Sequence, residues 1–347
     1  AEGMIPLVGK LYRKDNVKTY IYGHPLVNRS VIEIMQDHRK VRQIEQNELS
    51  EFETYPVLEA LAEHSLGHAH IDVGRIASAY YFNGADTDGQ GNKVELADYV
   101  RGQVDELIGS TRKPLEAPQD VVLYGFGRIG RLMARLLIEK TGGGDTLRLR
   151  TIVVRKGGKN DLIKRASLLQ RDSVHGQFDG TVRVDEERCS FIANGNEIKV
   201  IYADSPDQID YTEYGINNAL IVDNTGKWRD REGLELHLKS KGVRRVILTA
   251  PGKGDLKNIV SGINDGDIGV DDDILSAASC TTNAITPPLK ALNDYFGVES
   301  GHVETVHAYT NDQNLIDNYH KGDRRGRSAA LNMVLTETGA VKAVGKV

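Results

Sequence analysis

The chain has 347 residues, which is too long for one ordinary domain and favours two or three. Hydrophobic residues make up 39% and charged residues 27% of it, a balance that excludes wholesale disorder. A net charge of -5 gives no reason to expect a nucleic acid partner, and two cysteines are too few for a disulfide framework. Because residues 1–19 contain no apolar signal segment and no longer apolar stretch follows, we expect a cytoplasmic protein without a membrane partner.

Residues 1–118 are expected to form a mostly α-helical extension that ends in a linker. Apolar residues recur at helical spacing after Ser30, and residues 50–53 form an S-x-x-E capping box ahead of a second apolar run. A third helical pattern covers residues 94–108. Residues 110–118 are polar with two prolines, which is typical of a linker. One hypothesis for this extension is a regulatory or interaction role.

After the linker, short apolar runs alternate with helical segments over residues 119–278. The runs that predict strands are residues 121–124, 151–154, 219–222 and 245–248. Helical spacing covers residues 129–140 and 234–241. This alternation predicts an α/β fold, a Rossmann-type doubly wound parallel sheet. A further domain is expected to begin at residue 279 and to continue to residue 347.

A G-x-G-x-x-G motif follows the first predicted strand and opens the first predicted helix. Its glycines are Gly125, Gly127 and Gly130, with Phe126, Arg128 and Ile129 between them. In this context the first glycine permits a tight turn, the second lets a pyrophosphate approach the backbone, and the third lets helix and strand pack closely. The helix N-terminus then offers N–H groups to the phosphates. The motif therefore predicts a dinucleotide site.

The second predicted strand does not end in the acidic residue that usually binds the adenosine ribose of NAD. It ends instead in Arg155 and Lys156, which would suit a 2′-phosphate. One hypothesis is therefore that NADP is accepted alongside NAD. The alternative is that Asp161 or the backbone binds the ribose.

Cys280 lies between a strand-like segment and a predicted helix, where backbone N–H dipoles favour a thiolate. It is therefore a candidate nucleophile, whereas Cys189 is interpreted as a small buried apolar residue. His307 lies in an alternating segment, residues 303–310, where its imidazole would lie on one face of a sheet. An imidazole can exchange a proton with a neighbouring thiol or with a reacting oxygen.

Several motifs occur in an order that resembles the phosphorylating glyceraldehyde-3-phosphate dehydrogenase family, over about residues 120–347. They are GFGRIGR at 125–131, DSVHG at 172–176, TAPGKGD at 249–255, SCTTN at 279–283, VHAYTND at 306–312, HK at 320–321 with RR at 324–325, and TGAVKA at 338–343. The resemblance implies that residues 279–347 are an α+β catalytic domain. It also implies a homotetramer.

The implied reaction is the oxidative phosphorylation of D-glyceraldehyde 3-phosphate to 1,3-bisphosphoglycerate with NAD. Cys280 would form a hemithioacetal with the aldehyde, His307 would take its proton, and inorganic phosphate would cleave the thioester left by hydride transfer. The other site residues that the resemblance implies are Ser279, Thr281, Thr338 and Gly339 for the attacking phosphate, Thr310 and Arg325 for the substrate phosphate, and Thr225, Gly226 and Thr249 for the cofactor.

The chain also departs from the family pattern. The family's second cysteine, four residues after the nucleophile, is replaced here by Ala284, and the elements that relatives carry beyond residue 347 are missing. The catalytic domain is therefore expected to be incomplete, and the isolated chain inactive or poorly folded. Erythrose-4-phosphate dehydrogenase is an alternative activity, because changes that the sequence does not reveal could accommodate one more hydroxymethine unit in the substrate. No metal is expected, since no cysteine or carboxylate set completes a site with His64, His68 and His70.

Overall fold

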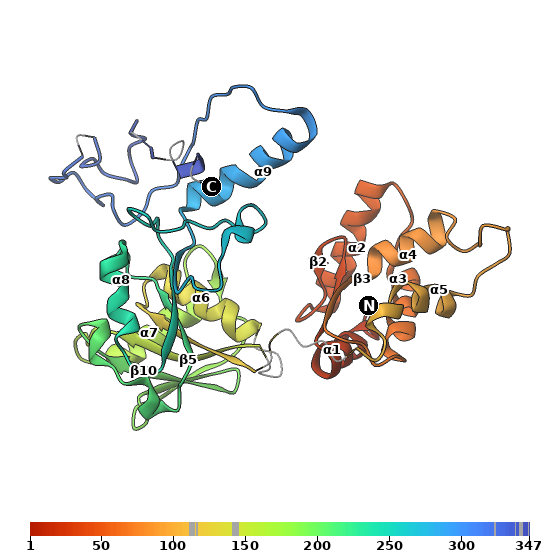
Figure 1. The fold of residues 1–347 in the computed structure, drawn as a ribbon, viewed down its shortest axis with the longest axis horizontal. Coiled ribbons are helices and arrows are strands. Elements are labelled where there is room, and N and C mark those ends of the chain that lie inside the picture. Colours follow the sequence, from red (N-terminus) through yellow and green to blue (C-terminus); the bar gives the residue numbers. More distant parts are fainter. Residues whose placement is uncertain are drawn as a thin grey trace. The chain divides into compact units, whose positions relative to one another are not determined.

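The computed structural model describes residues 1–110, 115, 117–140, 146–322, 324–336, 338–339, 343–345 and 347 (Figure 1). It divides into two compact units, residues 1–120 with 134–149 and residues 121–133 with 150–347. The predicted linker, residues 110–118, falls largely outside the described residues, as do residues 340–342 of the last family motif. Among the described helices, none is both long and apolar enough to cross a lipid bilayer.

The N-terminal region is mostly helical, as predicted (Figure 1). Its helices are α1 (Met4–Asp15), α2 (Val31–Glu45), α3 (Glu51–Ala62), α4 (Val73–Phe82) and α5 (Leu96–Gln103), followed by the 3-10 turn η1 (Asp105–Leu107). Complete capping boxes begin α2 at Ser30 and α3 at Ser50, so the second confirms the predicted S-x-x-E signal. The helical pattern predicted over residues 94–108 is only partly confirmed, because the α-helix ends at Gln103 and a separate 3-10 turn follows.

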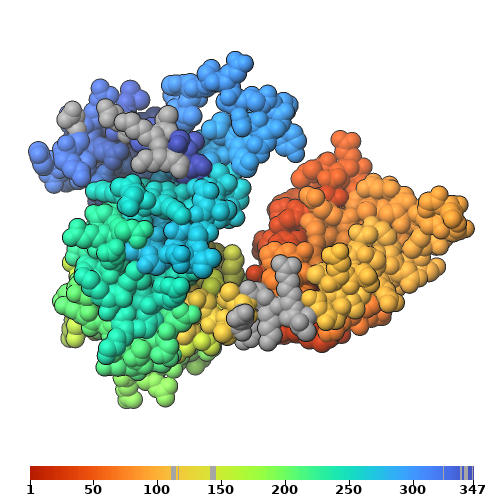
Figure 2. Space-filling view, in the orientation of Figure 1, coloured from red at the N-terminus to blue at the C-terminus, as the bar shows by residue number. Residues whose placement is uncertain are grey.

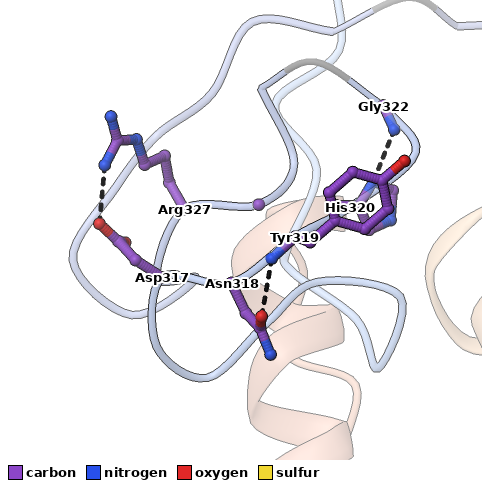
Figure 3. Close-up of a pocket in the computed structure, with 7 residues that line it drawn as sticks. Asp317, Asn318, Tyr319, His320, Gly322 and Arg327 are labelled. Atoms are coloured by element: carbon purple, nitrogen blue, oxygen red, sulfur yellow. Dashed lines mark hydrogen bonds and ion pairs between the residues drawn. The ribbon is translucent and has the colours of Figure 1, made fainter.

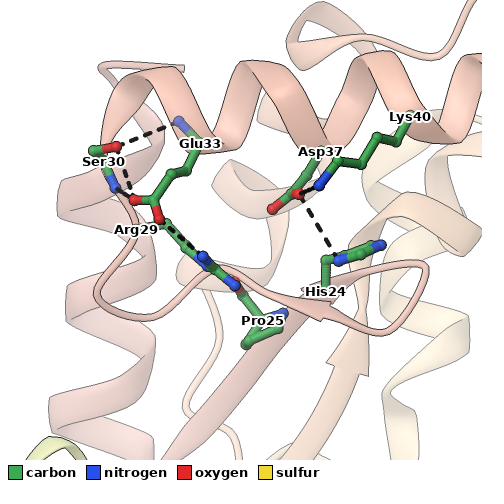
Figure 4. Close-up of polar contacts among 7 residues, drawn as sticks. All are labelled: His24, Pro25, Arg29, Ser30, Glu33, Asp37 and Lys40. Atoms are coloured by element: carbon green, nitrogen blue, oxygen red, sulfur yellow. Dashed lines mark hydrogen bonds and ion pairs between the residues drawn. The ribbon is translucent and has the colours of Figure 1, made fainter. Parts of the chain in front are cut away.

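A small sheet in this region was not predicted. It has the order β2 (His24–Pro25), β1 (Val17–Ile21) and β3 (Ala69–Asp72), with β1 and β3 parallel. In Figure 4, α2 turns Asp37 toward His24 and Lys40, whose nitrogens lie 3.8 and 3.5 Å from Asp37 Oδ1. Buried apolar side chains from the helices and from β1 and β3 form the core of this region.

The second region is built on an eight-stranded sheet of order β13-β12-β11-β4-β5-β10-β9-β8. Its strands are β4 (Gln119–Tyr124), β5 (Leu147–Val154), β8 (Val182–Asp185), β9 (Ser190–Ala193), β10 (Asn196–Tyr202), β11 (Ala219–Asp223), β12 (Val243–Leu248) and β13 (Ile274–Ser276). The pairs from β13 to β4 are parallel, and so is β5 with β10, whereas β8, β9 and β10 pair antiparallel. The four predicted strands are confirmed as β4, β5, β11 and β12.

The helices of this region follow strands, as an α/β fold requires. They are α6 (Arg128–Glu139) after β4, α7 (Asp161–Gln170) after β5, α8 (Arg231–Leu238) after β11 and α9 (Cys280–Phe296) after β13. Short further elements are β6 (Arg171–Asp172), β7 (Gly176–Gln177), η2 (Pro206–Gln208), η3 (Tyr211–Tyr214) and η4 (Asp265–Asp267). From β4 the chain adds β5 and β10 on one side, then returns to add β11, β12 and β13 on the other. The doubly wound prediction is therefore confirmed, with its topological switch point between β4 and β11.

The register of the parallel strands places the loops that follow them at one edge of the sheet. Tyr124 pairs with Asp223, Asp223 with Leu248, and Leu248 with Ser276. The segments that begin at Gly125, Asn224, Thr249 and Ala277 therefore leave the sheet side by side, at the edge where ligands bind in open α/β sheets.

Two sequence interpretations need correction here. Residues 303–310 form no strand, because they pair with no strand among the described residues, so His307 does not lie on a sheet face. Cys189 is half-buried rather than buried, in the turn between β8 and β9 with a φ of 49°. In Figure 2 the blue residues of the C-terminal segment lie next to the cyan residues that come before them in the chain.

Candidate active site

The glycine turn after β4 is shaped for close approach of a ligand to the backbone. Gly125 has a φ of 91°, and a Cβ there would lie 2.8 Å from Thr225 Cγ2. A Cβ on Gly130 would collide with the carbonyl oxygen of Gly125, whereas a Cβ on Gly127 would meet no atom within 4 Å. The turn is thus closely packed against other protein atoms at Gly125 and Gly130, and it is open at Gly127. Because the first N–H groups of a helix have no intrahelical partner, this turn and the start of α6 form a cradle that fits the pyrophosphate of a dinucleotide.

The residues between these glycines differ in their surroundings. Phe126 is buried and its ring centroid lies 6.1 Å from that of Phe191. Arg128 and Ile129 are exposed, and Arg128 Nη2 lies 3.4 Å from His175 Nε2. His175 belongs to the DSVHG motif, where its backbone N–H and that of Val174 donate to Asp172 Oδ1.

The turn after β11 is held by a hydrogen-bond network. Asp223 Oδ1 accepts from both the N–H and the hydroxyl of Thr225, each at 2.7 Å. The Thr249 hydroxyl lies 3.0 Å from the Asp223 carbonyl oxygen and 3.1 Å from Asn224 Oδ1. Gly226 continues the turn with a φ of 63°. The structure therefore brings Thr225, Gly226 and Thr249 together beside the glycine turn.

The loop after β5 carries the two basic residues singled out above. Arg155 and Lys156 are exposed, and Lys156 Nζ lies 5.8 Å from the ring centroid of Tyr202. The Asp161 carboxylate binds Arg165 Nε at 2.8 Å and accepts hydrogen bonds from Tyr202 and the Gly157 N–H. Desolvation raises the pKa of Asp161, but these hydrogen bonds and the charge of Arg165 together hold that pKa below its usual value. Asp161 is thus engaged in the structure of the loop.

The nucleophile candidate begins α9. Ser279 is the N-cap residue, and its hydroxyl accepts from the N–H of Thr282 at 3.0 Å. The preceding residue, Ala278, has a φ of 58°, a conformation that L side chains rarely adopt. Asn283 stabilises this sharp turn, because its amide donates to the carbonyl oxygens of Ala277 and Ser279 at 2.8 and 2.9 Å. Cys280 is consequently presented, exposed, at the helix N-terminus.

Cys280 and His307 meet although 26 residues separate them along the chain. The Sγ atom of Cys280 lies 3.4 Å from Nε2 of His307, and Nδ1 of His307 lies 2.6 Å from the carbonyl oxygen of Ala308. The hydrogen bond with His307 lowers the pKa of the Cys280 thiol, assisted by Thr281 against the effect of desolvation. The hydrogen bonds with Cys280 and with the Ala308 carbonyl raise the pKa of His307. The arrangement favours a thiolate beside an imidazolium.

This pairing predicts a pH dependence of alkylation. Because the thiol pKa of Cys280 is lowered, its thiolate persists to lower pH, and iodoacetamide should label Cys280 at a lower pH than an unperturbed cysteine. In His307→Asn the midpoint of the rate should move to higher pH. The measurement is the pH profile of labelling, followed by peptide mass spectrometry. Cys280→Ser is the control, because it reports the labelling of Cys189 alone. Equal pH midpoints of Cys280 labelling in wild type and His307→Asn would contradict the pairing.

Of the residues expected to hold the attacking phosphate, two share a pocket. Ser279 and Gly339 line a pocket of about 170 Å³ together with Thr282. The Thr281 hydroxyl lies 3.8 Å from Cys280 Sγ, and Thr338 is exposed. The pocket therefore adjoins the start of α9.

The residues expected to hold the substrate phosphate are engaged with neighbours. Arg325 Nη1 binds Asp312 Oδ2 at 2.6 Å and its Nε lies 3.3 Å from the Thr336 hydroxyl, while the Thr310 N–H donates to Gln313. The positive charge of Arg325 acts to lower the pKa of His307, against the larger effects of Cys280 and Ala308, which places it within electrostatic range of the thiol–imidazole pair. A ligand phosphate would have to compete with Asp312 for this guanidinium.

A second pocket, of about 270 Å³, lies in the same segment (Figure 3). In it Arg327 forms an ion pair with Asp317 at 2.7 Å, and His320 Nδ1 accepts from the Gly322 N–H. None of the predicted site residues, all of which the structure describes, lines it. His320, one of its lining residues, places Nε2 3.6 Å from Oδ2 of Asp312, the residue that binds Arg325.

Sequence reasoning missed three residues that organise this site. Asp223 and Asn283 hold the turns around Thr225 and Cys280, and Asp312 holds Arg325. The sequence contains only weak signals for these three residues. Asn283 and Asp312 lie inside the SCTTN and VHAYTND motifs, and Asp223 ends a predicted strand.

Two family models match the region that carries this geometry. The model for the glyceraldehyde 3-phosphate dehydrogenase NAD binding domain matches residues 119–231, and the model for the C-terminal domain of the same enzyme matches residues 279–347. The first match covers the glycine turn and the turn after β11. It shows that NAD is the cofactor of this region.

Known proteins are similar over different shares of the chain. A glyceraldehyde-3-phosphate dehydrogenase-like protein of Pseudomonas aeruginosa (strain UCBPP-PA14) is 61% identical over 345 residues, which cover 99% of this chain and 73% of that protein. Glyceraldehyde-3-phosphate dehydrogenase of Thermotoga maritima is 42% identical over 65% of each chain. The chloroplastic enzyme A of Zea mays is 41% identical over 69% of this chain and 57% of its own length. The chain thus spans less than two thirds of these last two relatives. It belongs to the glyceraldehyde-3-phosphate dehydrogenase family.

Proposed function

We propose that the protein catalyses the oxidative phosphorylation of D-glyceraldehyde 3-phosphate through a thioester on Cys280. The observation that carries this proposal is the 3.4 Å contact between Cys280 Sγ and His307 Nε2 at the edge of the sheet that also holds the glycine turn. A thiolate beside an imidazolium supplies both the nucleophile and the proton that addition to an aldehyde requires. The family match and the fold support the same reaction.

The chain's own residues account for the proton and sulfur chemistry. The Cys280 thiolate adds to the aldehyde carbon, forming a C–S bond, and the imidazolium of His307 donates its proton to the developing alkoxide. His307 then accepts the hydroxyl proton as the carbonyl re-forms in the oxidised thioester. Bound NAD would supply the hydride acceptor for this oxidation. Inorganic phosphate then attacks the acyl carbon and the C–S bond breaks. The Cys280 thiolate is the leaving group and is thereby regenerated, and the acyl phosphate is the product.

The two phosphate groups need separate sites. We assign the attacking phosphate to Ser279, Thr281, Thr338 and Gly339, because Ser279 and Gly339 line one pocket beside the nucleophile. The substrate phosphate is assigned to Thr310 and Arg325, whose planar guanidinium suits a dianionic phosphate once Asp312 is displaced. NAD would be held by Gly125 to Ile129 and by Thr225, Gly226 and Thr249.

The function is tested by NADH formation in the full-length protein. We expect the steady-state rate with glyceraldehyde 3-phosphate to require inorganic phosphate, because the thioester accumulates without it. Erythrose 4-phosphate is the control aldehyde. A steady rate that is independent of phosphate, or a higher kcat/KM for erythrose 4-phosphate, would contradict the proposal.

We also propose that NADP is accepted alongside NAD. The support is that Asp161 is engaged by Arg165 and Tyr202, whereas Arg155 and Lys156 are exposed at the end of β5. Two positive charges there would attract a 2′-phosphate and repel no group of NAD. Replacing both with glutamine should lower kcat/KM for NADP by about tenfold and leave the value for NAD within about twofold. Lys159→Gln, in the same loop, is the matched control, and a strong preference of the wild type for NAD would refute the proposal.

The homotetramer implied by the resemblance and the cytoplasmic location expected from the N-terminal sequence remain predictions. Analytical ultracentrifugation of the full-length protein, with and without residues 1–118, tests the first. Unchanged turnover with altered assembly after this deletion would favour an interaction role for the extension.

A further inference from the structure

A buried contact between a carboxylate and an imidazole adjoins the cofactor turn. Asp223 is the last residue of β11, and His237 lies in α8. Both side chains are fully buried, and His237 Nε2 lies 3.0 Å from Asp223 Oδ2. A carboxylate removed from water needs such a donor, because an unpaired buried charge is strongly destabilising.

The other oxygen of the same carboxylate binds the turn. Asp223 Oδ1 accepts two hydrogen bonds from Thr225, and the Thr225 hydroxyl accepts in turn from the N–H of Lys227 at 3.1 Å. The carboxylate therefore links α8 to the turn, because Oδ2 contacts His237 of α8 and Oδ1 accepts from Thr225 of the turn. If His237 withdrew its donor, the carboxylate would have to reorient toward another partner and would release Thr225.

The position of Thr225 in turn affects the glycine turn. Its Cγ2 atom occupies the space that a side chain on Gly125 would need. The Thr249 hydroxyl ties the neighbouring strand to the backbone of Asp223 and to Asn224. The turns after β4, β11 and β12 are thus held as one unit at the switch point of the sheet.

Packing alone does not explain an imidazole at position 237. Its ring contacts Tyr124 and Trp228 edge-on, at centroid distances of 4.7 and 6.0 Å, and an apolar side chain could make such contacts. Within the described residues, however, His237 Nδ1 is buried without a hydrogen-bond partner. That is unfavourable, and an apolar side chain would avoid it. The donor that Nε2 presents to Asp223 is what the imidazole adds.

We propose that Asp223 and His237 are a positioning pair that holds the Thr225–Gly226 turn in the conformation that binds the dinucleotide. Neither residue touches the cofactor in this account; both act through Thr225. The inference rests on the NAD-binding role of this turn and is independent of the reaction carried out at Cys280.

The first test is calorimetric titration of the full-length protein with NAD. His237→Leu, which removes the donor, should raise Kd by about tenfold, since a hydrogen bond to a charged group is lost. His237→Gln, whose amide can still donate to Asp223, should stay within about threefold of wild type. Ser240→Ala is the matched control, because it deletes a buried hydrogen bond, to the Pro206 carbonyl at 2.6 Å, that does not reach the turn. It should lower Tm without changing Kd.

The second test needs no ligand. In amide hydrogen exchange without NAD, the peptide that contains residues 224–227 should exchange faster in His237→Leu than in wild type, His237→Gln or Ser240→Ala. If the leucine variant proves too unstable, His237→Phe also lacks the donor and keeps a planar ring against Tyr124 and Trp228.

Unchanged Kd and unchanged exchange in the donor-less variant would overturn the inference, as would an equal loss of NAD affinity in Ser240→Ala. Because neither readout involves an aldehyde, a protein that fails to oxidise glyceraldehyde 3-phosphate but shows the expected shifts would refute the proposed function and leave this inference standing.

Discussion

Replacing Cys280 with serine should reduce the kcat for glyceraldehyde 3-phosphate oxidation by about a thousandfold or more. The hydroxyl of serine has a far higher pKa than a thiol and stays protonated beside His307, so the nucleophile is lost. Because Cys280 is exposed at the start of α9, the substitution should not disturb the fold. Steady-state NADH formation in the full-length protein measures the effect.

Two controls separate loss of the nucleophile from other effects. The Kd for NAD should be unchanged in Cys280→Ser, since the glycine turn belongs to other loops. Cys189→Ser, at the half-buried second cysteine, should keep kcat within about twofold of wild type. If Cys280→Ser retained more than about a tenth of the wild-type kcat, the thioester mechanism would be excluded.

Gly130→Ala should abolish NAD binding and destabilise the protein by about 1–3 kcal/mol. The new Cβ would collide with the carbonyl oxygen of Gly125, which is backbone and cannot move aside without opening the turn. The helix α6 would then shift from β4, and its N-terminus would no longer point at the pyrophosphate. Thermal unfolding and calorimetric titration with NAD measure the two effects.

The neighbouring glycine provides a contrast. A Cβ on Gly127 meets no protein atom within 4 Å, so Gly127→Ala should leave Tm unchanged yet weaken NAD binding, because the methyl group would occupy the space that the pyrophosphate needs. Gly158→Ala, also unobstructed, should be neutral in both assays. A normal Kd in Gly127→Ala would argue against placing the pyrophosphate at this turn.

The parts of the fold that could be predicted are those whose signal is local. Continuous apolar runs predicted β4, β5 and β11, because strands buried on both faces lose the alternation of half-buried strands. A short apolar run, residues 246–248, predicted β12. The hairpin of β9 and β10 was missed although Asn194 and Gly195, with φ of 47° and 81°, form the Asn-Gly turn that signals it. The small sheet of the N-terminal region was missed because β1 finds its parallel partner β3 about fifty residues later.

The same distinction applies to the site. The spacing of Gly125, Gly127 and Gly130 identified the glycine turn, because all the residues that shape this turn lie within one short segment of the sequence. Asp223 and His237 meet only because α8 packs against β12, the strand that pairs with β11, so no spacing in the sequence marks them as a pair. His307 was singled out while its segment was wrongly expected to be a strand; what places it beside Cys280 is an irregular segment.

The measurement that tests the central claim most directly is mass spectrometry of the full-length protein after reaction with glyceraldehyde 3-phosphate and NAD in the absence of inorganic phosphate. We predict that the peptide carrying Cys280 gains a 3-phosphoglyceroyl group in thioester linkage, that inorganic phosphate removes it, and that His307→Asn slows its formation. Formation of NADH while Cys280 stays unmodified would contradict the account.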